Sequence, residues 1–370
     1  MSTNIAAAQK YITFAIPCYN VADYVDNCVH SILAGCAQYL SYIEIILVDD
    51  GSKNDSTPEI IDRWQAKHPD FIRAIHQENG GHGQAVNTGL ANASGIYFKV
   101  VDADDWLDES ACQQYLSSIV KHVQDVCTTD SEENKDCKSD QHERKLLDMI
   151  ITNYVYEKVF EDKRTTIRYS SVMPVNKDFT WNELGRLRPY QNILMHSVTY
   201  RTQMLQDIGF CLPKHTFYVD NVFVYLPLPH VQGIRYLDLD LYRYFIGREG
   251  QSVNERVMVS RIEQQLRVTR IMIDAYDLDK DINCKRLRTY MESFITMMMV
   301  ICSVFLLLSK RDDALALRSE IWAYLAKKNP TAYPRIRRSV MGRGVNLAGR
   351  GGEAITILGY RAARKIFKFS

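Results

Sequence analysis

The chain has 370 residues, of which 46% are hydrophobic and 24% are charged, and its formal net charge is +1. This composition is typical of a folded globular protein, and it excludes a disordered chain, a collagen-like chain and a small disulfide-bonded scaffold. The length predicts about two domains.

Charge is unevenly distributed along the chain. Residues 331–370 contain nine Arg and Lys residues against one acid, Glu353, so this segment has a net charge of +8 and the remainder has −7. We interpret the segment as a basic appendage on a mildly acidic body. Because the total charge is close to zero, we expect no nucleic-acid partner.

The cysteines, the N-terminal residues and one apolar run indicate where in the cell the protein is expected. The nine cysteines form no CxxC pair and show no zinc-ligand spacing, which favours reduced thiols and a cytoplasmic protein. The first ten residues lack the apolar core of an export signal. An apolar run at 294–308 has 15 residues, whereas a membrane span needs about 20. We therefore expect a buried core helix there, with a membrane span as the alternative.

Strands and helices alternate along the first 110 residues. The expected strands lie at 11–16, 43–48, 71–76 and 96–101, and the expected helices at 25–33, from Thr57 onward and at 83–93. Such alternation forms βαβ units, a mostly parallel sheet and right-handed crossovers. Ligands of these sheets bind at the carboxyl ends of the strands.

The rest of the chain divides into three parts. Residues 124–145 are polar and without periodicity, and we interpret them as a surface insertion. Short strands at 149–159, 193–200 and 234–244 are expected to complete the sheet. Helices are then predicted at 256–276, 281–308 and 312–327, ending before Pro330.

Acidic residues follow two of the predicted strands directly. They are Asp49, Asp50, Asp102, Asp104 and Asp105. If the two strands are near neighbours, these carboxylates converge on one crevice and repel one another unless a cation is present. Hard divalent ions such as Mg²⁺ and Mn²⁺ bind carboxylates together with phosphate oxygens, so the pattern indicates a metal that holds a diphosphate. The alternative is that these residues cap turns and helices.

A glycine-rich loop lies between the two acidic clusters. Residues 79–89 contain four glycines and two asparagines and lead into a predicted helix. Glycines allow a ligand to approach the backbone closely, and a helix N-terminus favours negative charge. The loop matches neither a Walker A motif nor GxGxxG after the first strand. A simple turn is the alternative.

Four motifs occur in order, each after a predicted strand or in the loop. They are Pro17-Cys18-Tyr19-Asn20, Val48-Asp49-Asp50-Gly51-Ser52 with Asp55-Ser56-Thr57, the loop at 79–89, and Val101-Asp102-Ala103-Asp104-Asp105-Trp106. In order, spacing and context, residues 10–115 closely resemble family-two inverting glycosyltransferases of bacterial polysaccharide and cell-envelope type. The likeness continues less firmly to about residue 255. It implies an α/β GT-A nucleotide-sugar-binding fold with a mostly parallel central sheet at 1–253, followed by a helical extension at 254–330 and a basic amphipathic tail at 331–370.

The same resemblance implies roles for individual residues. Asp49 should hydrogen-bond a base, usually uracil, and Asp102 should lie beside the ribose. Asp104, together with Asp102, should bind Mn²⁺ or Mg²⁺. Many relatives have Arg where Val86 stands, so we assign the phosphate contact to Arg248, whose alternative is a surface-loop arginine. The implied nucleotide-binding residues are Pro17, Tyr19, Asn20, Asp49, Asp50, Asn79, Gly80, Gly81, His82, Asp102, Ala103 and Arg248.

An inverting transfer also requires a base for the acceptor hydroxyl. By resemblance, Asp220 in the segment Phe217-Tyr218-Val219-Asp220-Asn221 is the predicted base, and capping of a helix from Asn221 is its alternative. Three histidines could add a metal ligand, although packing or exposure is the commoner role of such residues: His196, His215 and His230. Trp181 could belong to an acceptor platform, but we expect core packing.

The tail has its own pattern. Residues 354–369 mix aliphatic and basic side chains at helical spacing, which suits peripheral contact with an anionic membrane surface. A solvated helix docked on the acidic body is the alternative.

Taken together, the residues and the resemblance predict a metal-assisted enzyme. It would transfer a hexosyl or N-acetylhexosaminyl group from a nucleotide sugar, expected to be UDP-linked, with inversion, to a hydroxyl of a glycan, lipid-linked or wall-polymer acceptor. The alternatives are a nucleotidyltransferase that forms nucleotide sugars and a catalytically silent nucleotide-sugar-binding scaffold.

Overall fold

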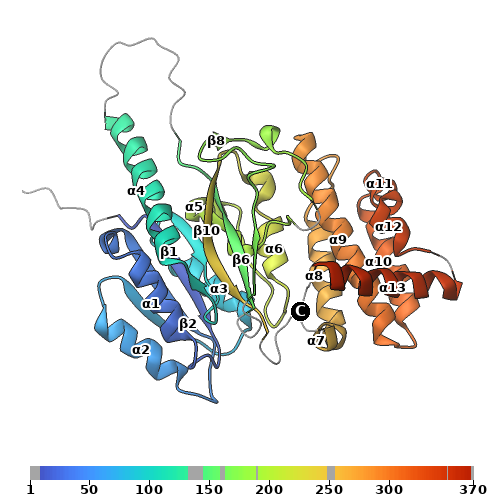
Figure 1. The fold of residues 1–370 in the computed structure, drawn as a ribbon, viewed down its shortest axis with the longest axis horizontal. Helices are drawn as coiled ribbons and strands as arrows, with labels where there is room; N and C mark the ends of the chain where they lie inside the picture. The colour runs from blue at the N-terminus through green and yellow to red at the C-terminus, as the bar shows by residue number, and fades with distance from the viewer. Residues whose placement is uncertain are drawn as a thin grey trace, which may run out of the picture. The chain divides into compact units, whose positions relative to one another are not determined.

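The fold was analysed in a computed structural model, which describes residues 9–131, 145–158, 163–188, 191–247, 255–347 and 349–367. The chain forms two compact units (Figure 1). The first comprises residues 1–180, 193–215 and 230–245, and the second comprises 181–192, 216–229 and 246–370. Residues 181–192, 216–229 and 246–253, all within the predicted domain at 1–253, therefore group with the C-terminal helices.

One mixed sheet organises the first unit. Its strands run in the order β3-β2-β1-β4-β9-β6-β10-β5, with β7 on β6 and β8 on β10. β1 to β4 are parallel, β9 is antiparallel to β4 and β6, and β6 and β10 are parallel. The strands are β1 (Ile12–Cys18), β2 (Ile43–Asp49), β3 (Ile72–His76), β4 (Tyr97–Val100), β5 (Trp106–Leu107), β6 (Met149–Lys158), β7 (Lys163–Ile167), β8 (Asp178–Phe179), β9 (Val198–Arg201) and β10 (Ile234–Phe245).

The first strands and helices follow from their side chains. Every residue of β1 and β2 is buried, as expected of strands covered on both faces. The helices of this unit are α1 (Val25–Gly35), α2 (Thr57–Lys67), α3 (His82–Asn92), α4 (Glu109–Ser131) and α5 (Thr202–Asp207). α1 packs against both α2 and α4. The predicted α/β fold with a mostly parallel sheet is confirmed.

Helix α3 packs on the face of the sheet opposite to α1 and α2. Right-handed crossovers place α1 and α2 on one face of the sheet and α3 on the other (Figure 1). α3 packs closely on β1 because Gly89 has no side chain; a Cβ there would lie 2.8 Å from the Cβ of Ala15. This packing places the N-terminus of α3 near the carboxyl end of β1.

Two predictions of local structure were wrong. Residues 124–131, predicted as part of a surface insertion, belong to α4, because Val123 and Val126 lie on the buried face of this helix. Residues 132–144 of the predicted insertion lie outside the described residues. The strand predicted at 193–200 begins only at Val198, because Met195–Ser197 form a 3₁₀ turn in which Ser197 Oγ donates to the carbonyl of Leu194.

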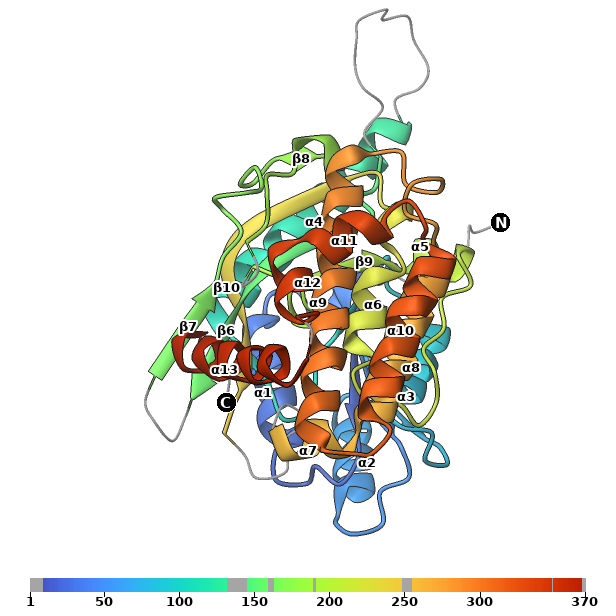
Figure 2. The ribbon, with the colours of Figure 1, turned by 90° about the vertical axis from the view of Figure 1, so that its right-hand side faces the viewer.

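The second unit is helical. Its helices are α6 (Asp220–Tyr225), α7 (Glu255–Ser260), α8 (Ile262–Ala275), α9 (Lys285–Ser309), α10 (Ala314–Lys328), α11 (Tyr333–Arg338), α12 (Val340–Gly344) and α13 (Gly349–Phe367). Figure 2 shows α9 in the middle of these helices, and α7, α8, α10, α11, α12 and α13 all contact it. By length and composition α9 could cross a membrane, and 61% of its most apolar stretch is buried within the protein.

Candidate active site

The order of the strands reverses at β1, which has β2 on one side and β4 on the other. Open α/β sheets bind ligands at the carboxyl ends of the strands at such a reversal. The Asp50 N–H donates to the Cys18 carbonyl over 2.8 Å, and the Val101 N–H donates to the Ala15 carbonyl over 3.0 Å. The two acidic clusters therefore leave the sheet on either side of the end of β1, as the sequence predicts.

The carboxylate of Asp50 holds the glycine-rich loop. Oδ1 accepts hydrogen bonds from Gln77 Nε2 at 2.6 Å and from the Gly80 N–H at 2.9 Å. Oδ2 accepts from the Gly81 N–H at 2.8 Å and from Asn79 Nδ2 at 3.1 Å. With four donors on a buried carboxylate, Asp50 shapes the backbone of the predicted nucleotide-binding loop.

Asp49 is the last residue of β2 and is also buried. Its Oδ1 accepts from the Ser52 N–H at 2.9 Å, and its Oδ2 lies 3.2 Å from Nδ1 of His76. His76 Nε2 lies 3.0 Å from Oδ1 of Asp62, so the imidazole bridges two carboxylates. Burial lowers the pKa of His76, but the hydrogen bonds to Asp62 and Asp49 outweigh burial and raise the pKa above its usual value.

The loop after β1 is held by Asn20. This residue has φ 51°, and its Oδ1 accepts from the N–H groups of Lys53 and Asn54, each at 3.2 Å. Asparagine tolerates this left-handed conformation better than most residues. Pro17, which precedes this loop in β1, is buried. The ring of Tyr19, directly before Asn20 in the sequence, is half exposed. An exposed ring beside the end of β2 is available to stack on a base.

Asp102 lies two residues beyond β4 and faces the start of α3. Its Oδ1 lies 2.8 Å from Nε2 of His82, the first residue of α3. Gly81, directly before the helix, has φ 83°, which an L side chain adopts only under strain. The Asp102 N–H donates to the Tyr242 hydroxyl at 3.0 Å. One turn thus joins the end of β4 to both the glycine-rich loop and β10.

Asp105 is buried below this turn. The Tyr242 hydroxyl donates to its Oδ2 at 2.7 Å, and the Phe245 N–H donates to its Oδ1 at 2.8 Å. Burial, together with the charge of Asp102, raises the pKa of Asp105 well above its usual value. A second negative charge close to Asp102 is therefore costly unless a cation or a proton accompanies it.

His196 completes the cluster from the turn before β9. Its ring stacks on Tyr242, with ring centres 4.7 Å apart. Nδ1 lies 3.9 Å from Oδ2 of Asp102, too far for a hydrogen bond, and it is a buried atom with no hydrogen-bond partner among the described residues. Burial lowers the pKa of His196 to about 4, which leaves a neutral imidazole at pH 7.

A buried lysine lies behind the same ring. Lys99 Nζ donates to the carbonyls of His196 at 2.9 Å and Val198 at 3.4 Å, and it lies 5.5 Å from the centre of the Tyr242 ring. Burial lowers the pKa of Lys99 to about 7. Its two carbonyl contacts tie the backbone of His196 to β4.

These residues fit a divalent cation. One ligand atom each from Asp102, Asp105 and His196 lie within 4.8 Å of one another, close to the about 4.2 Å that separates opposite ligands of one Mg²⁺ ion. The partnerless Nδ1 of His196 supplies a neutral nitrogen, which Mn²⁺ accepts more readily than Mg²⁺. Asp104, the predicted ligand, lies in the adjoining turn with a partly exposed side chain and is not part of this group.

The sequence of this unit matches a known protein family. Residues 13–183 match the model of Glycosyl transferase family 2. This part of the chain is a family 2 glycosyltransferase domain. The uncharacterized glycosyltransferase EpsJ of Bacillus subtilis (strain 168) is 38% identical over 115 residues, which are 31% of this chain and 32% of EpsJ. Glycosyltransferase GlyA of Streptococcus pneumoniae serotype 4 is 38% identical over 115 residues, 16% of its own length. The chain thus spans a third or less of these two relatives.

Solved structures confirm the GT-A fold. The crystal structure of S. aureus TarS 1–349 in complex with UDP-GlcNAc has a TM-score of 0.63 at 17% identity and covers 97% of this chain and 91% of that one. A second TarS 1–349 structure has a TM-score of 0.61.

The remaining predicted residues of the glycosyltransferase lie in different places. Ala103 is buried beside Asp102, and Asn79 is exposed on the glycine-rich loop. Arg248 lies outside the described residues. Asp220 is the first residue of α6 in the second unit, where Asn221 Nδ2 donates to its Oδ1 at 3.1 Å. Its role as base stays a prediction.

The structure decides some of the alternatives that the sequence left open. Trp181 is buried and its indole N–H donates to the Leu228 carbonyl at 3.0 Å, which confirms core packing. His215 and His230 are exposed, and neither belongs to the metal-ligand group found among the described residues. Eight of the nine cysteines are free thiols, and Cys137 lies outside the described residues. The sequence placed Asp105 in the acidic cluster, but the metal was assigned to Asp104 and Asp102.

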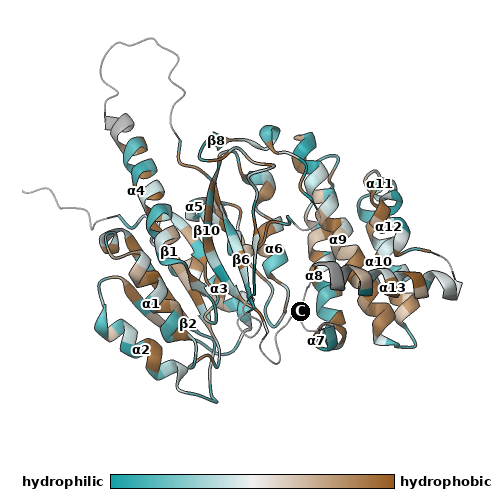
Figure 3. Cartoon of the chain, in the orientation of Figure 1, coloured by the Kyte–Doolittle hydropathy of each residue, from teal (hydrophilic) through white to brown (hydrophobic). Residues whose placement is uncertain are grey.

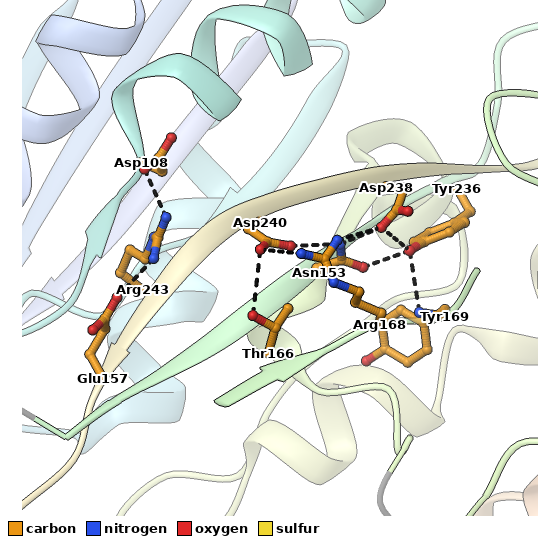
Figure 4. A network of polar contacts seen from close by, with 10 residues as sticks. All are labelled: Asp108, Asn153, Glu157, Thr166, Arg168, Tyr169, Tyr236, Asp238, Asp240 and Arg243. Atoms are coloured by element: carbon orange, nitrogen blue, oxygen red, sulfur yellow. Dashed lines mark hydrogen bonds and ion pairs between the residues drawn. The ribbon is translucent and has the colours of Figure 1, made fainter. Parts of the chain in front are cut away.

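A second polar cluster on β6, β7 and β10 escaped sequence analysis (Figure 4). Asn153 Nδ2 donates to both Asp238 and Asp240, at 2.7 and 2.9 Å, and Arg168 pairs with the same two carboxylates at 3.0 and 2.6 Å. The register of β10 against β6 shifts between Leu237 and Tyr242. Because of this irregularity, Asp238 and Asp240, two residues apart on β10, both contact Asn153. The shift also sets the position of Tyr242.

Proposed function

We propose that this protein transfers a hexosyl or N-acetylhexosaminyl group from a UDP-sugar to a hydroxyl of a glycan, lipid-linked or wall-polymer acceptor, with inversion at the anomeric carbon. The observation that carries the proposal is the group of Asp102, Asp105 and His196 at the carboxyl end of the sheet of a family 2 glycosyltransferase domain. The UDP-GlcNAc bound in the TarS structure supports a UDP-sugar as donor. The eight free thiols support a cytoplasmic location.

Donor binding is assigned to the first unit. In this proposal the half-exposed Tyr19 stacks on the base, Asp49 accepts its hydrogen bond, and Asp102 lies beside the ribose. Asp102, Asp105 and His196 would hold Mn²⁺ or Mg²⁺, with Asp104 as a further ligand, and such an ion neutralises the charge of the departing diphosphate. The glycine-rich loop, shaped by Asp50, presents backbone N–H groups near the start of α3.

The transfer itself is a single displacement. The acceptor oxygen forms a bond to the anomeric carbon while the bond from that carbon to the diphosphate oxygen breaks. The electron pair of the broken bond leaves with UDP, and the proton of the acceptor hydroxyl passes to the carboxylate of Asp220. Asp220 is the first residue of the short helix α6, and its side chain is partly exposed.

The first experiment measures thermal shifts with UDP, GDP, CDP, TDP and NAD, each with and without Mn²⁺. A ligand at a hundredfold excess over its dissociation constant stabilises a protein by about 2.7 kcal/mol. We expect a shift with UDP that requires Mn²⁺ and is lost in His196→Gln and Asp104→Asn. Asp207→Asn, on α5, is the matched control. The absence of a shift with any nucleotide would refute the donor site, whereas a shift with UDP but no transfer to any acceptor would support the silent scaffold.

The second experiment separates binding from chemistry. Asp220→Asn should bind UDP like the unaltered protein and lose transfer to acceptor, because the amide cannot take the proton. Normal transfer by Asp220→Asn would refute the assignment of the base. Release of pyrophosphate from UTP and a sugar phosphate would show a nucleotidyltransferase, and we expect none.

A further inference from the structure

The C-terminal helix α13 is attached to the second unit by one of its faces. Thr356 is buried, and its Oγ1 donates to the Gly344 and Gly352 carbonyls at 3.0 and 2.9 Å. The ring of Tyr360, one turn later, packs edge-on against Phe305 of α9 with ring centres 5.7 Å apart. The Tyr360 hydroxyl also lies 3.2 Å from Oε2 of Glu255. These contacts determine which side of α13 faces the protein.

The side of α13 turned away from these contacts carries exposed aliphatic side chains. Ile355 is 58% exposed and Leu358 is 69% exposed, and residues three apart share one face of a helix. Ala354 and Ala362 are exposed as well. A helix whose outer face meets only water commonly carries polar side chains there, and the exposed Ile355 and Leu358 depart from that pattern. Figure 3 shows hydrophobic and hydrophilic residues alternating along α13.

Basic side chains accompany the apolar face. Arg361 is exposed one turn after Leu358, and Arg338 and Arg343 are exposed on α11 and α12. α12 contacts α13, and its first residue, Val340, is 91% exposed. The residues from 331 to the end of the sequence have a net charge of +8. The helices α11 to α13 therefore combine exposed aliphatic groups with an excess of positive charge.

We propose that α13 docks on an anionic lipid surface, with Ile355 and Leu358 below the headgroups and Arg361 at the level of the lipid phosphates. The aliphatic groups explain attachment to a bilayer, and the positive charge selects anionic lipid over neutral lipid. This inference does not depend on the proposed sugar transfer. It assigns the outer face of α13 to a lipid, and a second copy of the chain or another protein would be a competing occupant.

The test is flotation of the full chain with vesicles. Phosphatidylcholine vesicles with and without phosphatidylglycerol are compared at low and at molar salt. We expect binding only to vesicles that contain phosphatidylglycerol, and weaker binding at molar salt because ions screen the attraction. Absence of flotation with the anionic vesicles would overturn the proposal, and equal binding to both vesicle types would overturn its electrostatic part.

Matched variants locate the contact. The double variant Ile355→Ser/Leu358→Ser should lower the partition coefficient by about a hundredfold, since burial of each CH₂ group contributes to anchoring. Leu315→Ser, on a leucine of α10 that is 53% exposed, should leave binding unchanged. Circular dichroism and thermal unfolding check that the variants fold. If both variants bind like the unaltered protein, or if the double variant abolishes a concentration-dependent dimer instead, α13 is not the lipid contact.

The charge is tested separately. Arg361→Gln should weaken binding about fivefold, because one arginine near an anionic surface contributes about 1 kcal/mol. Lys327→Gln, an exposed lysine on α10, removes the same charge elsewhere in the unit and should have a smaller effect. Equal losses in the two variants would show a diffuse charge effect and contradict the placement of Arg361 at the phosphates.

Discussion

Replacement of Asp50 by asparagine tests how the glycine-rich loop is held. Each carboxylate oxygen of Asp50 accepts two hydrogen bonds, one pair from Gln77 and Gly80 and the other from Asn79 and Gly81. Whichever way the amide of Asp50→Asn is turned, its NH₂ group faces one of these pairs of donors. Two hydrogen bonds are therefore lost, and the donors that made them face another donor.

The magnitude follows from these contacts. A hydrogen bond to a charged group contributes about 1.5–3 kcal/mol, and the exposed side of the loop can recover part of the loss from water. We expect Asp50→Asn to lower the free energy of unfolding by about 3 kcal/mol. Asp62→Asn is the control, because the Asp62 side chain is 61% exposed and pairs with His76 in a surface contact; it should cost less than about 1 kcal/mol.

Equilibrium urea unfolding measures both effects, and hydrogen exchange localises them. Peptides that cover residues 77–89 should exchange faster in Asp50→Asn, whereas peptides from β1 should change less. Equal urea midpoints for the two variants, with unchanged exchange in the loop, would refute the interpretation of Asp50 as the residue that holds the loop. Loss of UDP binding with unchanged stability would instead show a direct contact with the ligand.

Two further predictions concern backbone strain and a buried charge. Gly51→Ala should destabilise the protein by about 2 kcal/mol, because Gly51 has φ +74° and the new Cβ would lie 2.9 Å from the Asn79 nitrogen; a urea midpoint equal to that of the unaltered protein would contradict this. Burial lowers the pKa of Lys99 from 10.5 to about 7, so the unfolded chain binds more protons between these pH values and stability rises with pH. From pH 7 to pH 9 this contribution is about 2 kcal/mol. Lys99→Met should lack this rise of stability with pH. The same pH dependence in both proteins would show that folding does not lower the pKa of Lys99.

The site divides into a part that the sequence predicts and a part that it does not. Asp49, Asp50 and Asp102 follow strands whose apolar runs are evident in the sequence, and parallel strands bring their carboxyl ends to one edge. The positions of these acids were therefore predictable. The use of both Asp50 oxygens for the loop was not, since hydrogen-bond direction depends on the path of the backbone between Gln77 and Gly81.

Helix boundaries show the same division. No helix was predicted from the sequence between residues 101 and 124, but α4 spans Glu109–Ser131, and Val126 lies on its buried face. The pattern of the tail predicted an amphipathic helix. Only packing could show that Thr356 and Tyr360 face the protein while Ile355 and Leu358 face outward. Periodicity defines the faces of a helix, and tertiary contacts decide which face is covered.

The sequence by itself determined the order of strands and helices in the first half of the chain, because alternation of short apolar runs and amphipathic stretches is a local property. The cluster of Asp105, Tyr242 and His196 was decided by the tertiary structure alone. Tyr242 pairs with Leu107 across β10 and β5, which places its hydroxyl 2.7 Å from Asp105, 137 residues away in the sequence. No local pattern encodes a contact over that separation, since it depends on which strands are neighbours and on the register between them.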